Sequence, residues 1–381
     1  MSVALGSVCR FLNGGTPDKS VARFFEGSNP WITSADITGP VASDARSFIS
    51  DEAIAKSATN KVPKDAVLLV TRTGVGKVAI AGRDLCISQD ITALLPDQSR
   101  VATSYLVHFL RTKKEHFVSM ARGATIKGIT RDVVAELSVP LPPLPEQRRI
   151  AAILDQADAL RAKRREALAQ LDSLTQSIFI EMFGDPVVNP RAWELIPFGS
   201  VGNLDRGVSK ARPRNAPELL GGPYPLIQTG DVANCDGYVR DHTSTYSEAG
   251  LRQSRLWPAG TLCITIAANI AKTGILMFDA CFPDSVVGFT ASQPATVEYV
   301  RVWLSFLQKA LEDAAPESAQ KNINLAILRE LKVPVPPLAF QHTFATRIQA
   351  IESLKAIHRA TLAESDALFA SLQHRAFRGE L

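Results

Sequence analysis

The stretch VPLPPLPEQRRIAAIL (139–154) returns later in the chain as VPVPPLAFQHTFATRI (333–348). The second copy begins 194 residues after the first, and seven of the sixteen positions are identical. Two further pairs match at an offset of 195: NPWITSADI (29–37) with YPLIQTGDV (224–232), and VPKDAVLLVTRTGVGKVAI (62–80) with WPAGTLCITIAANIAKTGI (257–275). Matches in the same order over most of each half predict a duplicated domain pair, because solenoid repeats are only about 20–50 residues long.

A long helix is predicted after each Pro-rich junction, over residues 146–183 and 340–377. Alternating spacings of four and three are typical of a coiled-coil seam. The seam predicted in this way consists of Ile153, Ala157, Leu160, Arg164, Ala167, Leu171, Leu174 and Ile178 in the first helix, and of Ile351, Leu354, His358, Thr361, Ser365, Leu368 and Leu372 in the second. Each helix would be on the order of 55 Å long. Because an apolar stripe needs a partner, we expect the two helices to pack antiparallel.

Shorter patterns precede each junction. Residues 66–71 and 261–266 are typical of buried strands, and residues 104–111 and 297–311 of amphipathic helices. The junction itself cannot continue a helix and favours an extended conformation, so it can set the angle at which the long helix leaves its domain. A Pro-rich ligand for a partner domain is the less favoured alternative. Pro145 suits a first helical turn, whereas the second copy has Ala339 there and lacks this start signal.

These patterns predict an α+β fold with two similar α/β domains, related by pseudo-two-fold symmetry and separated by a coiled coil of two long helices. The predicted segments are a first domain at 1–144, a first helix at 145–185, a second domain at 186–338, and a second helix with the C-terminal tail at 339–381.

Composition indicates a folded protein that works in a reducing compartment. The chain is 46% apolar and 21% charged, and its net charge of +4 permits nucleic-acid binding without establishing it. Its five scattered cysteines form no CxxC pair, which argues against a disulfide framework or a thiolate zinc site. No signal peptide and no apolar run of bilayer length are found, so we expect a cytoplasmic location and no membrane partner.

Catalytic and cofactor motifs are missing from the sequence. GVGK (74–77) suggests a phosphate loop, but Thr71 stands where the earlier glycine is required and Val78 where a Ser or Thr would hold magnesium. No HExxH or close His/Cys/Asp cluster predicts a metal site, and no nucleophile elbow or dinucleotide fingerprint is present. A binding or scaffold role is therefore favoured over catalysis.

The order of these features resembles the specificity subunit of type I restriction–modification systems. The residues that carry the resemblance are the two junctions, GATIKGITRDVVAELSVPLPPL (123–144), GGTP (14–17), AANIAKTGIL (267–276) and SLQHRAFRGEL (371–381). It covers nearly the whole chain, and the ordered set is more specific than any single motif.

The resemblance implies a non-catalytic chain that recognises double-stranded DNA. Each globular domain would be a target recognition domain that reads one half of a split, asymmetric sequence. The helices would fix the spacing of the half-sites and dock two methylation subunits, with restriction subunits in the full complex. This chain would bind no cofactor; S-adenosylmethionine, ATP and magnesium would be bound by the partner subunits.

Candidate DNA-contacting residues come from loops at matching places in both halves, because phosphates and base edges are contacted by basic, amide and hydroxyl side chains. In the first half they are Thr16, Lys19, Thr33, Ser34, Arg72, Thr73, Lys77, Arg122 and Lys127. In the second they are Ser209, Lys210, Arg212, Gln228, Thr229, Asn269, Lys272, Gln320, Lys321 and Asn322. Asp36 and Asp231, which match across the copies, are interpreted as turn or cap residues. A stand-alone bipartite DNA-binding regulator and a protein scaffold remain alternatives.

Overall fold

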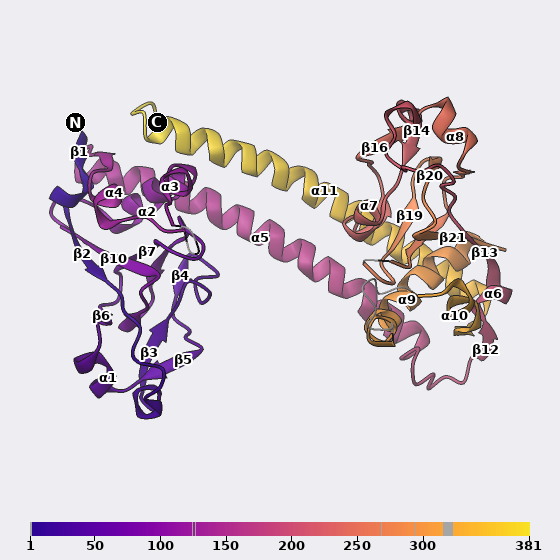
Figure 1. Ribbon diagram of the computed structural model, residues 1–381, viewed down its shortest axis with the longest axis horizontal. Helices are drawn as coiled ribbons and strands as arrows, with labels where there is room; N and C mark the ends of the chain where they lie inside the picture. Colours follow the sequence, from indigo (N-terminus) through magenta and orange to yellow (C-terminus); the bar gives the residue numbers. More distant parts are fainter. Residues whose placement is uncertain (1, 124, 126, 268, 293, 315–322) are drawn as a thin grey trace. The chain divides into compact units, whose positions relative to one another are not determined.

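Two compact units make up the chain. The computed structural model describes residues 2–123, 125, 127–267, 269–292, 294–314 and 323–381 (Figure 1). The first unit comprises Met1–Arg165 and Ala360–Leu381, and the second comprises Glu166–Arg359. The division runs through both long helices, α5 (Leu144–Phe183) and α11 (Leu338–Ala376), so that each unit holds one part of each helix. The domain segments expected from the sequence treat the helices as separate pieces, whereas here each part of a helix belongs to the unit whose core it completes.

Three sheets form the first unit, in the orders β2-β10-β7-β8-β4, β5-β3-β9-β6 and β1-β11. In Figure 1, β2, β10 and β7 lie side by side. The strands are β1 (Ser2–Ala4), β2 (Cys9–Asn13), β3 (Asn29–Ile32), β4 (Val41–Ala42), β5 (Ser47–Ile49), β6 (Asn60–Val62), β7 (Val67–Val70), β8 (Val78–Ala81), β9 (Leu85–Ile87), β10 (Ile91–Pro96) and β11 (Ser138–Pro140). The helices besides α5 are η1 (Leu5–Ser7), η2 (Ala22–Phe25), α1 (Asp51–Lys56), α2 (Thr103–Thr112), α3 (Lys114–Met120) and α4 (Arg131–Ala135).

The second unit repeats these sheets, in the orders β13-β21-β18-β19-β15, β16-β14-β20-β17 and β12-β22. Its strands are β12 (Glu194–Pro197), β13 (Gly202–Arg206), β14 (Leu220–Leu226), β15 (Gly237–Val239), β16 (Ser244–Tyr246), β17 (Leu256–Trp257), β18 (Leu262–Thr265), β19 (Thr273–Leu276), β20 (Ala280–Cys281), β21 (Val286–Ala291) and β22 (Lys332–Val335). Its helices are α6 (Phe198–Val201), η3 (Pro217–Leu219), α7 (Thr229–Ala233), α8 (Glu248–Arg252), α9 (Pro294–Ala314) and α10 (Leu325–Glu330). Strand for strand, the connectivity is that of the first unit, so the α+β fold with two similar units is confirmed.

Buried strands at the centre of each five-stranded sheet explain why the sequence pattern was readable. Along β7, Val67 and Leu69 join a core cluster with α2, whereas Leu68 and Val70 join a cluster on the opposite face. Side chains alternate across a strand, and both faces of this one are covered, so every position is apolar. The predicted strands at 66–71 and 261–266 and helices at 104–111 and 297–311 correspond to β7, β18, α2 and α9.

The two long helices begin at equivalent residues, Leu144 and Leu338, although only the first has a proline next in the chain. A buried glutamine makes the same contact at each start: Gln147 Nε2 donates to Pro142 O at 2.9 Å, and Gln341 Nε2 to Pro336 O at 3.0 Å. The second copy lacks the proline start signal, as expected, but its helix begins at the equivalent residue, because this glutamine is common to both copies and ties the first turn to the Pro-rich junction.

A tyrosine from an earlier helix, α2 or α9, holds the same junction in both units. The Tyr105 hydroxyl donates to Pro140 O at 2.9 Å, and the Tyr299 hydroxyl donates to Pro334 O at 2.5 Å. Both rings are fully buried. Pro140 and Pro334 themselves lie on β11 and β22, which pair antiparallel with β1 and β12. The junction is thus an anchored edge strand, as its structural interpretation requires.

The observed seam between the long helices differs from the predicted one. At four positions, the residue that faces the partner helix is the one after the predicted residue. Leu160, Leu174, Leu354 and Leu368 were expected in the seam but are 54%, 42%, 49% and 59% exposed. Their neighbours Arg161, Thr175, Lys355 and Phe369 face the interior instead. A search for apolar residues misses Arg161 and Lys355 because they are basic. Their aliphatic stems are covered while their charged groups pair with Asp366 and Asp172.

Candidate nucleic-acid interface

Three loops of the first unit meet at one edge of the five-stranded sheet. Because β2, β10 and β7 are antiparallel neighbours, the ends of β2 and β7 lie beside the start of β10. Gly14 N donates to Ile91 O at 3.0 Å, and Thr71 N donates to Asp90 O at 2.8 Å. A Cβ at Gly14 would lie 2.0 Å from Ser88 O, so only glycine allows this approach.

Two further loops join this edge. Lys77 Nζ donates to Ser34 O at 3.3 Å and to Ile37 O at 3.4 Å, which holds the loop after β3. Ile129 N donates to Thr71 O at 2.9 Å, which brings in the segment after α3. We call the surface formed by residues 14–20, 33–37, 71–77, 88–90 and the described part of 121–130 the first loop edge. It carries five basic residues and three acidic ones, an excess that favours an anionic partner.

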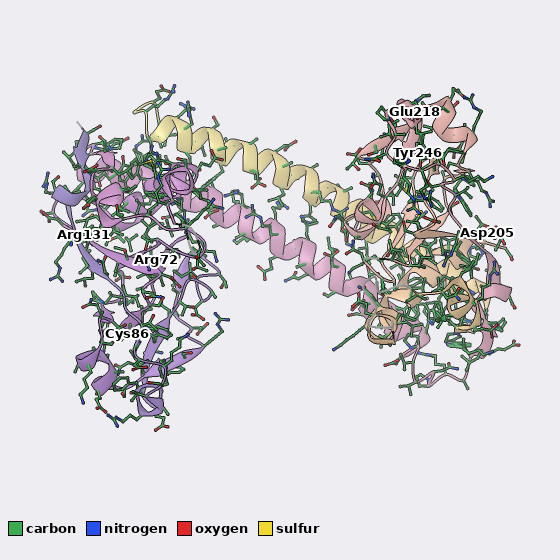
Figure 2. All side chains as sticks on the ribbon, in the orientation of Figure 1. Arg72, Cys86, Arg131, Asp205, Glu218 and Tyr246 are labelled. Atoms are coloured by element: carbon green, nitrogen blue, oxygen red, sulfur yellow. The ribbon has the colours of Figure 1, made fainter. Side chains whose placement is uncertain are left out.

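The candidate residues of the first unit lie on this edge but differ in availability. Lys19, Arg72, Thr73, Lys77, Arg122 and Lys127 are exposed, and Thr16 is half-buried. Arg72, labelled in Figure 2, forms a backbone bridge with Gly128, as does Arg122. Thr73 and Lys127 line one open pocket of about 400 Å³. Lys77 Nζ already donates to Ser34 O and Ile37 O, whereas the other exposed side chains can reach a ligand without rearrangement.

Other candidates have structural contacts. Ser34 is only 4% exposed. The Thr33 hydroxyl donates to Asp36 Oδ2 at 2.7 Å, and Arg46 Nε donates to Asp36 Oδ1 at 2.6 Å. Burial would raise the pKa of the Asp36 carboxyl, but these hydrogen bonds outweigh burial and lower that pKa. Asp36 is therefore an ionised cap of the loop, as its matched position suggested, and Asp231 caps α7 in the second unit by accepting from Gln228 N at 2.8 Å.

The second unit builds the same edge with different side chains. Gly207 N donates to Val286 O at 2.8 Å, Ile266 N to Ser285 O at 3.0 Å, and Ile323 N to Ile266 O at 2.9 Å. These bonds are equivalent to those of Gly14, Thr71 and Ile129, and they place Ser209 where the first unit has Thr16. The second loop edge comprises residues 207–215, 228–233, the described part of 266–272, 283–285 and Ile323.

A pocket of about 210 Å³ with polar and apolar lining residues opens on the second loop edge. Three candidates, Ser209, Gln228 and Thr229, line it together. Ser209 is 7% exposed, and its hydroxyl has no hydrogen-bond partner among the described residues. A buried hydroxyl without a partner costs about 1–3 kcal/mol, so a ligand that supplies one is favoured.

Neighbouring arginines hold the walls of this pocket. Arg212 Nη1 donates to Ser209 O at 2.7 Å and to Ala211 O at 2.8 Å, so this candidate shapes the loop. Arg214 pairs with Asp284 at 2.8 Å at the pocket wall. Sequence reasoning missed Arg214, Asn215 and Ser244, which also line the pocket. The sequence signal for Arg214 and Asn215 was the basic run KARPRN (210–215). Lys210 and Arg212 of this run were named as candidates, but the two residues after Pro213 were not.

The remaining candidates of the second unit are less concentrated. Lys210 and Asn269 are exposed, and the Asn269 carbonyl accepts a hydrogen bond from the Thr265 hydroxyl. Lys272 lines a different pocket, of about 380 Å³, beside α5 and α9. Gln320, Lys321 and Asn322 lie outside the described residues. Within the part of the chain that is described, no group of three His, Cys, Asp or Glu side chains could hold a metal ion. No helix among these residues is long and apolar enough to span a membrane.

Comparison with known families identifies the repeated unit. A family model described as the type I restriction modification DNA specificity domain matches residues 1–170 and 190–364. The chain belongs to this family. Each match includes one loop edge and most of one long helix, so the internal repeat is a repeat of this DNA specificity domain. The family is one of specificity domains rather than catalytic domains, in agreement with the expected non-catalytic chain.

Curated relatives and solved structures agree with this assignment. The chain is 28% identical over 179 residues to the EcoR124I/EcoR124II specificity subunit of Escherichia coli, which covers 45% of this chain and 44% of that subunit. It is 20% identical to the MjaVIII specificity subunit of Methanocaldococcus jannaschii, over 94% of this chain and 87% of that one. The match spans less than half of the length of the first of these relatives.

The fold of the specificity-domain chain is similar to that of the type I S subunit from M. genitalium, with a TM-score of 0.62 and 15% identity over 99% of this chain and 96% of that one. It is also similar to a chain from a study of complex assembly and conformational transition in a type I system, with a TM-score of 0.57 and 18% identity over 100% and 98% of the two chains. At these identities the likeness shows the fold alone.

Proposed function

We propose that this chain is the DNA sequence-recognition subunit of a type I restriction–modification enzyme, and that each loop edge reads one half of a split, asymmetric site. The observation that carries the proposal is that four equivalent loops gather on one sheet edge in each unit, joined there by Ile129 or by Ile323, with different side chains at equivalent places. Thr16 is replaced by Ser209, and Thr33 by Gln228. Identical edges would read identical half-sites; these edges favour different ones.

The side chains on the edges suit DNA. Arg and Lys contact phosphates and guanine, whereas Asn, Gln and Ser contact adenine and other base edges. The first edge exposes Arg72, Arg122 and Lys127. On the second edge, Ser209, Asn215 and Gln228 surround a pocket. We expect the first edge to depend more on charge, and the second more on hydrogen bonds to bases.

The helices would set the half-site spacing and dock two methylation subunits. In the first unit Leu160 and Leu368 are exposed, close to the cross-helix pair of Arg161 with Asp366. In the second, Leu174 and Leu354 are exposed, close to the pair of Lys355 with Asp172. Exposed apolar side chains repeated at equivalent places mark a partner surface. Each unit would therefore dock one methylation subunit on its own parts of α5 and α11.

Cofactors would belong to the partners. This chain is proposed to bind none, while the methylation subunits would hold S-adenosylmethionine and the restriction subunits ATP and magnesium. Support comes from the sequence, which lacks nucleotide-binding and metal-binding motifs. Isothermal titration of the isolated chain with S-adenosylmethionine should give no binding heat; saturable binding would place the methyl donor on this subunit instead.

Co-expression with a methylation subunit tests the proposal. Adenine methylation in the host genome should appear at a split, asymmetric sequence, and the isolated chain should methylate nothing. Specific DNA binding that neither recruits nor needs a methylation subunit would favour the stand-alone regulator. Assembly with protein partners but without sequence-dependent DNA binding would favour the scaffold.

The spacer role has its own test. Inserting four residues, about one helical turn, between Arg161 and Leu171 should lengthen the preferred gap between half-sites or prevent assembly. An insertion that leaves the preferred gap unchanged would refute the spacer role while leaving DNA recognition untouched.

A further inference from the structure

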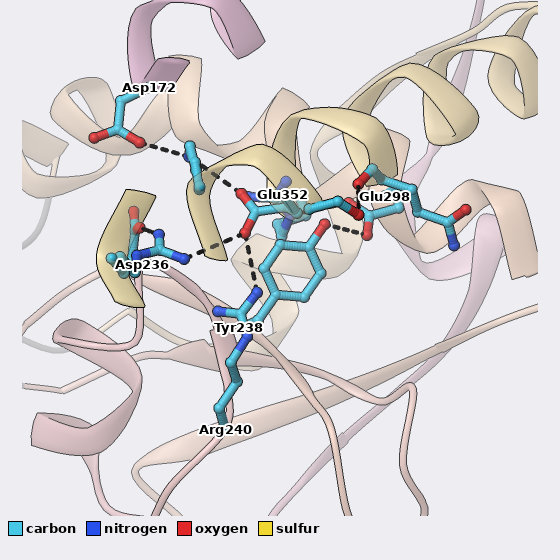
Figure 3. A network of polar contacts seen from close by, with 11 residues as sticks. Asp172, Asp236, Tyr238, Arg240, Glu298 and Glu352 are labelled. Carbon is cyan, nitrogen blue, oxygen red and sulfur yellow. Dashed lines mark hydrogen bonds and ion pairs between the residues drawn. The ribbon is translucent and has the colours of Figure 1, made fainter. Parts of the chain in front are cut away.

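A network of charged residues links the strand β15 of the second unit to its parts of both long helices (Figure 3). The network contains four acids and four bases: Asp172, Asp236, Glu298, Glu352, Arg240, Arg301, Lys355 and Arg359. Charges of both signs are equal in number, so the network is neutral and can be held close together at low cost. Asp172 lies on α5, Glu352 on α11 and Glu298 on α9.

Glu352 is the centre of the network. Its side chain is 11% exposed, and three bases approach its two oxygens. Arg240 Nη2 lies 3.0 Å from Oε2, Lys355 Nζ lies 3.1 Å from Oε1, and Arg359 Nη1 lies 3.8 Å from Oε2. Lys355 also pairs with Asp172 at 2.5 Å, and Arg359 pairs with Asp236 next to β15. One carboxylate therefore joins the helix α11 to the loop on both sides of β15.

Tyr238, within β15, fixes the other end of the network. Its ring centroid lies 4.8 Å from the Arg240 guanidinium carbon and 4.9 Å from that of Arg301. Its hydroxyl donates to Glu298 Oε1 at 2.6 Å. Burial raises the pKa of the Tyr238 phenol, so the phenol remains a hydrogen-bond donor at neutral pH. Cation–π contacts of this kind hold Arg240 in the direction of Glu352.

The loop after β15 leads from Arg240 directly to the second loop edge. The Thr243 hydroxyl donates to Asp231 Oδ1 at 3.0 Å. Asp231 Oδ2 in turn accepts a hydrogen bond from Gln228 N at 2.8 Å. Gln228 Nε2 donates to Ser244 Oγ at 3.3 Å. Gln228, Arg240 and Arg359 also line one open pocket of about 650 Å³. A shift of Arg240 would therefore move the residues that hold Gln228.

The described residues of the first unit do not form this network. There β4 pairs with β8 as β15 pairs with β19, and this register places Val41 where the second unit has Tyr238. Ser43 then stands in the place of Arg240, and neither residue is charged. Asp158, which is equivalent to Glu352 at the 194-residue offset, pairs with Arg111 and Arg161 instead. The network is thus a property of the second unit.

We propose that Glu352 is a positioning residue for the second half-site: through Arg240 it fixes Gln228 and Thr229 relative to α11. The inference rests on the proposed function and adds to it. It makes the second half-site the one whose distance from α11 is held by the Glu352 network, which is absent from the described residues of the first unit.

Hydrogen exchange of the full chain tests the structural part, with no DNA. Glu352→Gln removes the central charge. The matched control is Asp205→Asn, which alters the exposed ion pair between Asp205 on β13 and Arg255. Amides of residues 239–244 and of Gln228 should exchange at least about fivefold faster in Glu352→Gln than in the control, equivalent to a loss of about 1 kcal/mol. Equal exchange at these amides in the two variants would overturn the proposal. Should Glu352→Gln not fold, the more exposed Arg240→Gln replaces it.

Methylation by the assembled enzyme tests the functional part. Duplexes carry the site found for the wild-type chain, with the gap between half-sites normal or changed by one base pair. Glu352→Gln should lower the ratio of methylation at the normal gap to that at the altered gap about fivefold, while Asp205→Asn keeps the wild-type ratio. A uniform loss at every gap would show a merely structural role and overturn positioning. A wild-type enzyme without a split site would instead overturn the proposed function, and the exchange result would stand apart from it.

Discussion

Arg161 and Lys355 make the same cross-helix contact from equivalent places in the two units. Arg161 of α5 lies 2.5 Å from Asp366 of α11, and Lys355 of α11 lies 2.5 Å from Asp172 of α5. Both the bases and the acids are separated by the 194-residue offset of the sequence repeat. In each unit the pairing runs antiparallel, since Arg149 also contacts the C-terminal Leu381 and Arg347 contacts Glu181. Each copy of the repeat therefore encodes one base and one acid for the opposite helix.

Loss of either acid should weaken helix pairing. Asp366→Asn leaves Arg161, whose side chain is 17% exposed, without its cross-helix partner, and Asp172→Asn does the same to Lys355, at 5%. Because the acids are half exposed, we expect a modest cost of about 1 kcal/mol in the free energy of unfolding for each variant. Urea denaturation measures it. Asp185→Asn, outside the helices, is the control; equal midpoints for all three variants would contradict the pairing.

The tyrosine that holds each junction gives a second stability prediction. Tyr105→Phe and Tyr299→Phe each remove one buried hydroxyl and leave a proline carbonyl without its donor. The expected loss is about 1–3 kcal/mol in the free energy of unfolding. Tyr224→Phe, whose hydroxyl is exposed, should cost less. Calorimetry measures the free energy of unfolding. An equal loss for Tyr224→Phe and the other two variants would show that the hydrogen bond to the junction adds no stability beyond that of an exposed hydroxyl.

Two leucines of α5, one exposed and one buried, should distinguish an effect on assembly from an effect on folding. Leu160→Gln changes an exposed residue, so the isolated chain should keep its stability while its binding to a methylation subunit falls at least about tenfold. Leu154→Ala removes a fully buried side chain and should cost about 2–5 kcal/mol of unfolding free energy. Binding is measured by surface plasmon resonance. Undiminished binding by a folded Leu160→Gln chain would remove this face from the proposed docking surface.

His108 should make the first unit sensitive to acid. Its Nε2 lies 2.7 Å from Asp155, but burial outweighs this carboxylate and lowers the His108 pKa below 6.5. A lowered folded pKa means that the unfolded chain binds the proton more readily, so stability present above pH 6.5 is lost as the pH falls through the folded pKa. His108→Val, which introduces the residue found at the equivalent Val302, should flatten the urea midpoint between about pH 7 and pH 5. A midpoint that falls equally in both chains would assign the acid sensitivity elsewhere.

The fold was largely predictable because the repeat and the apolar periodicity are both visible in the sequence. The strands β7 and β18 and the helices α5 and α11 follow from them. The seam was only half predictable: a heptad rule chooses Leu160 over Arg161, yet the Arg161 guanidinium lies 4.2 Å from the Phe369 ring and pairs with Asp366. Both choices satisfy the spacing, and only the partner helix decides between them.

The candidate interface was predictable in its loops but not in the state of each side chain. Residue type and matching position indicated Arg72 and Lys77 equally. In the structure both residues are exposed, but the Lys77 ammonium donates to two carbonyls 43 and 40 positions earlier in the chain, whereas Arg72 is tied to Gly128 through its backbone. Ser209 and Gln228 are 19 positions apart in the sequence and line one pocket. Contacts of this kind depend on how strands are arranged in the sheets, which no local spacing records.

Mapping methylated adenines tests the central claim most directly, with the methylation subunit co-expressed alongside the wild-type chain or the variant Ser209→Ala/Gln228→Ala. The wild-type chain should give one split, asymmetric sequence, and the variant should relax one half of that sequence and leave the other half unchanged. A contiguous or palindromic site for the wild-type chain, or a variant that alters both halves together, would contradict the account of two loop edges that read separate half-sites.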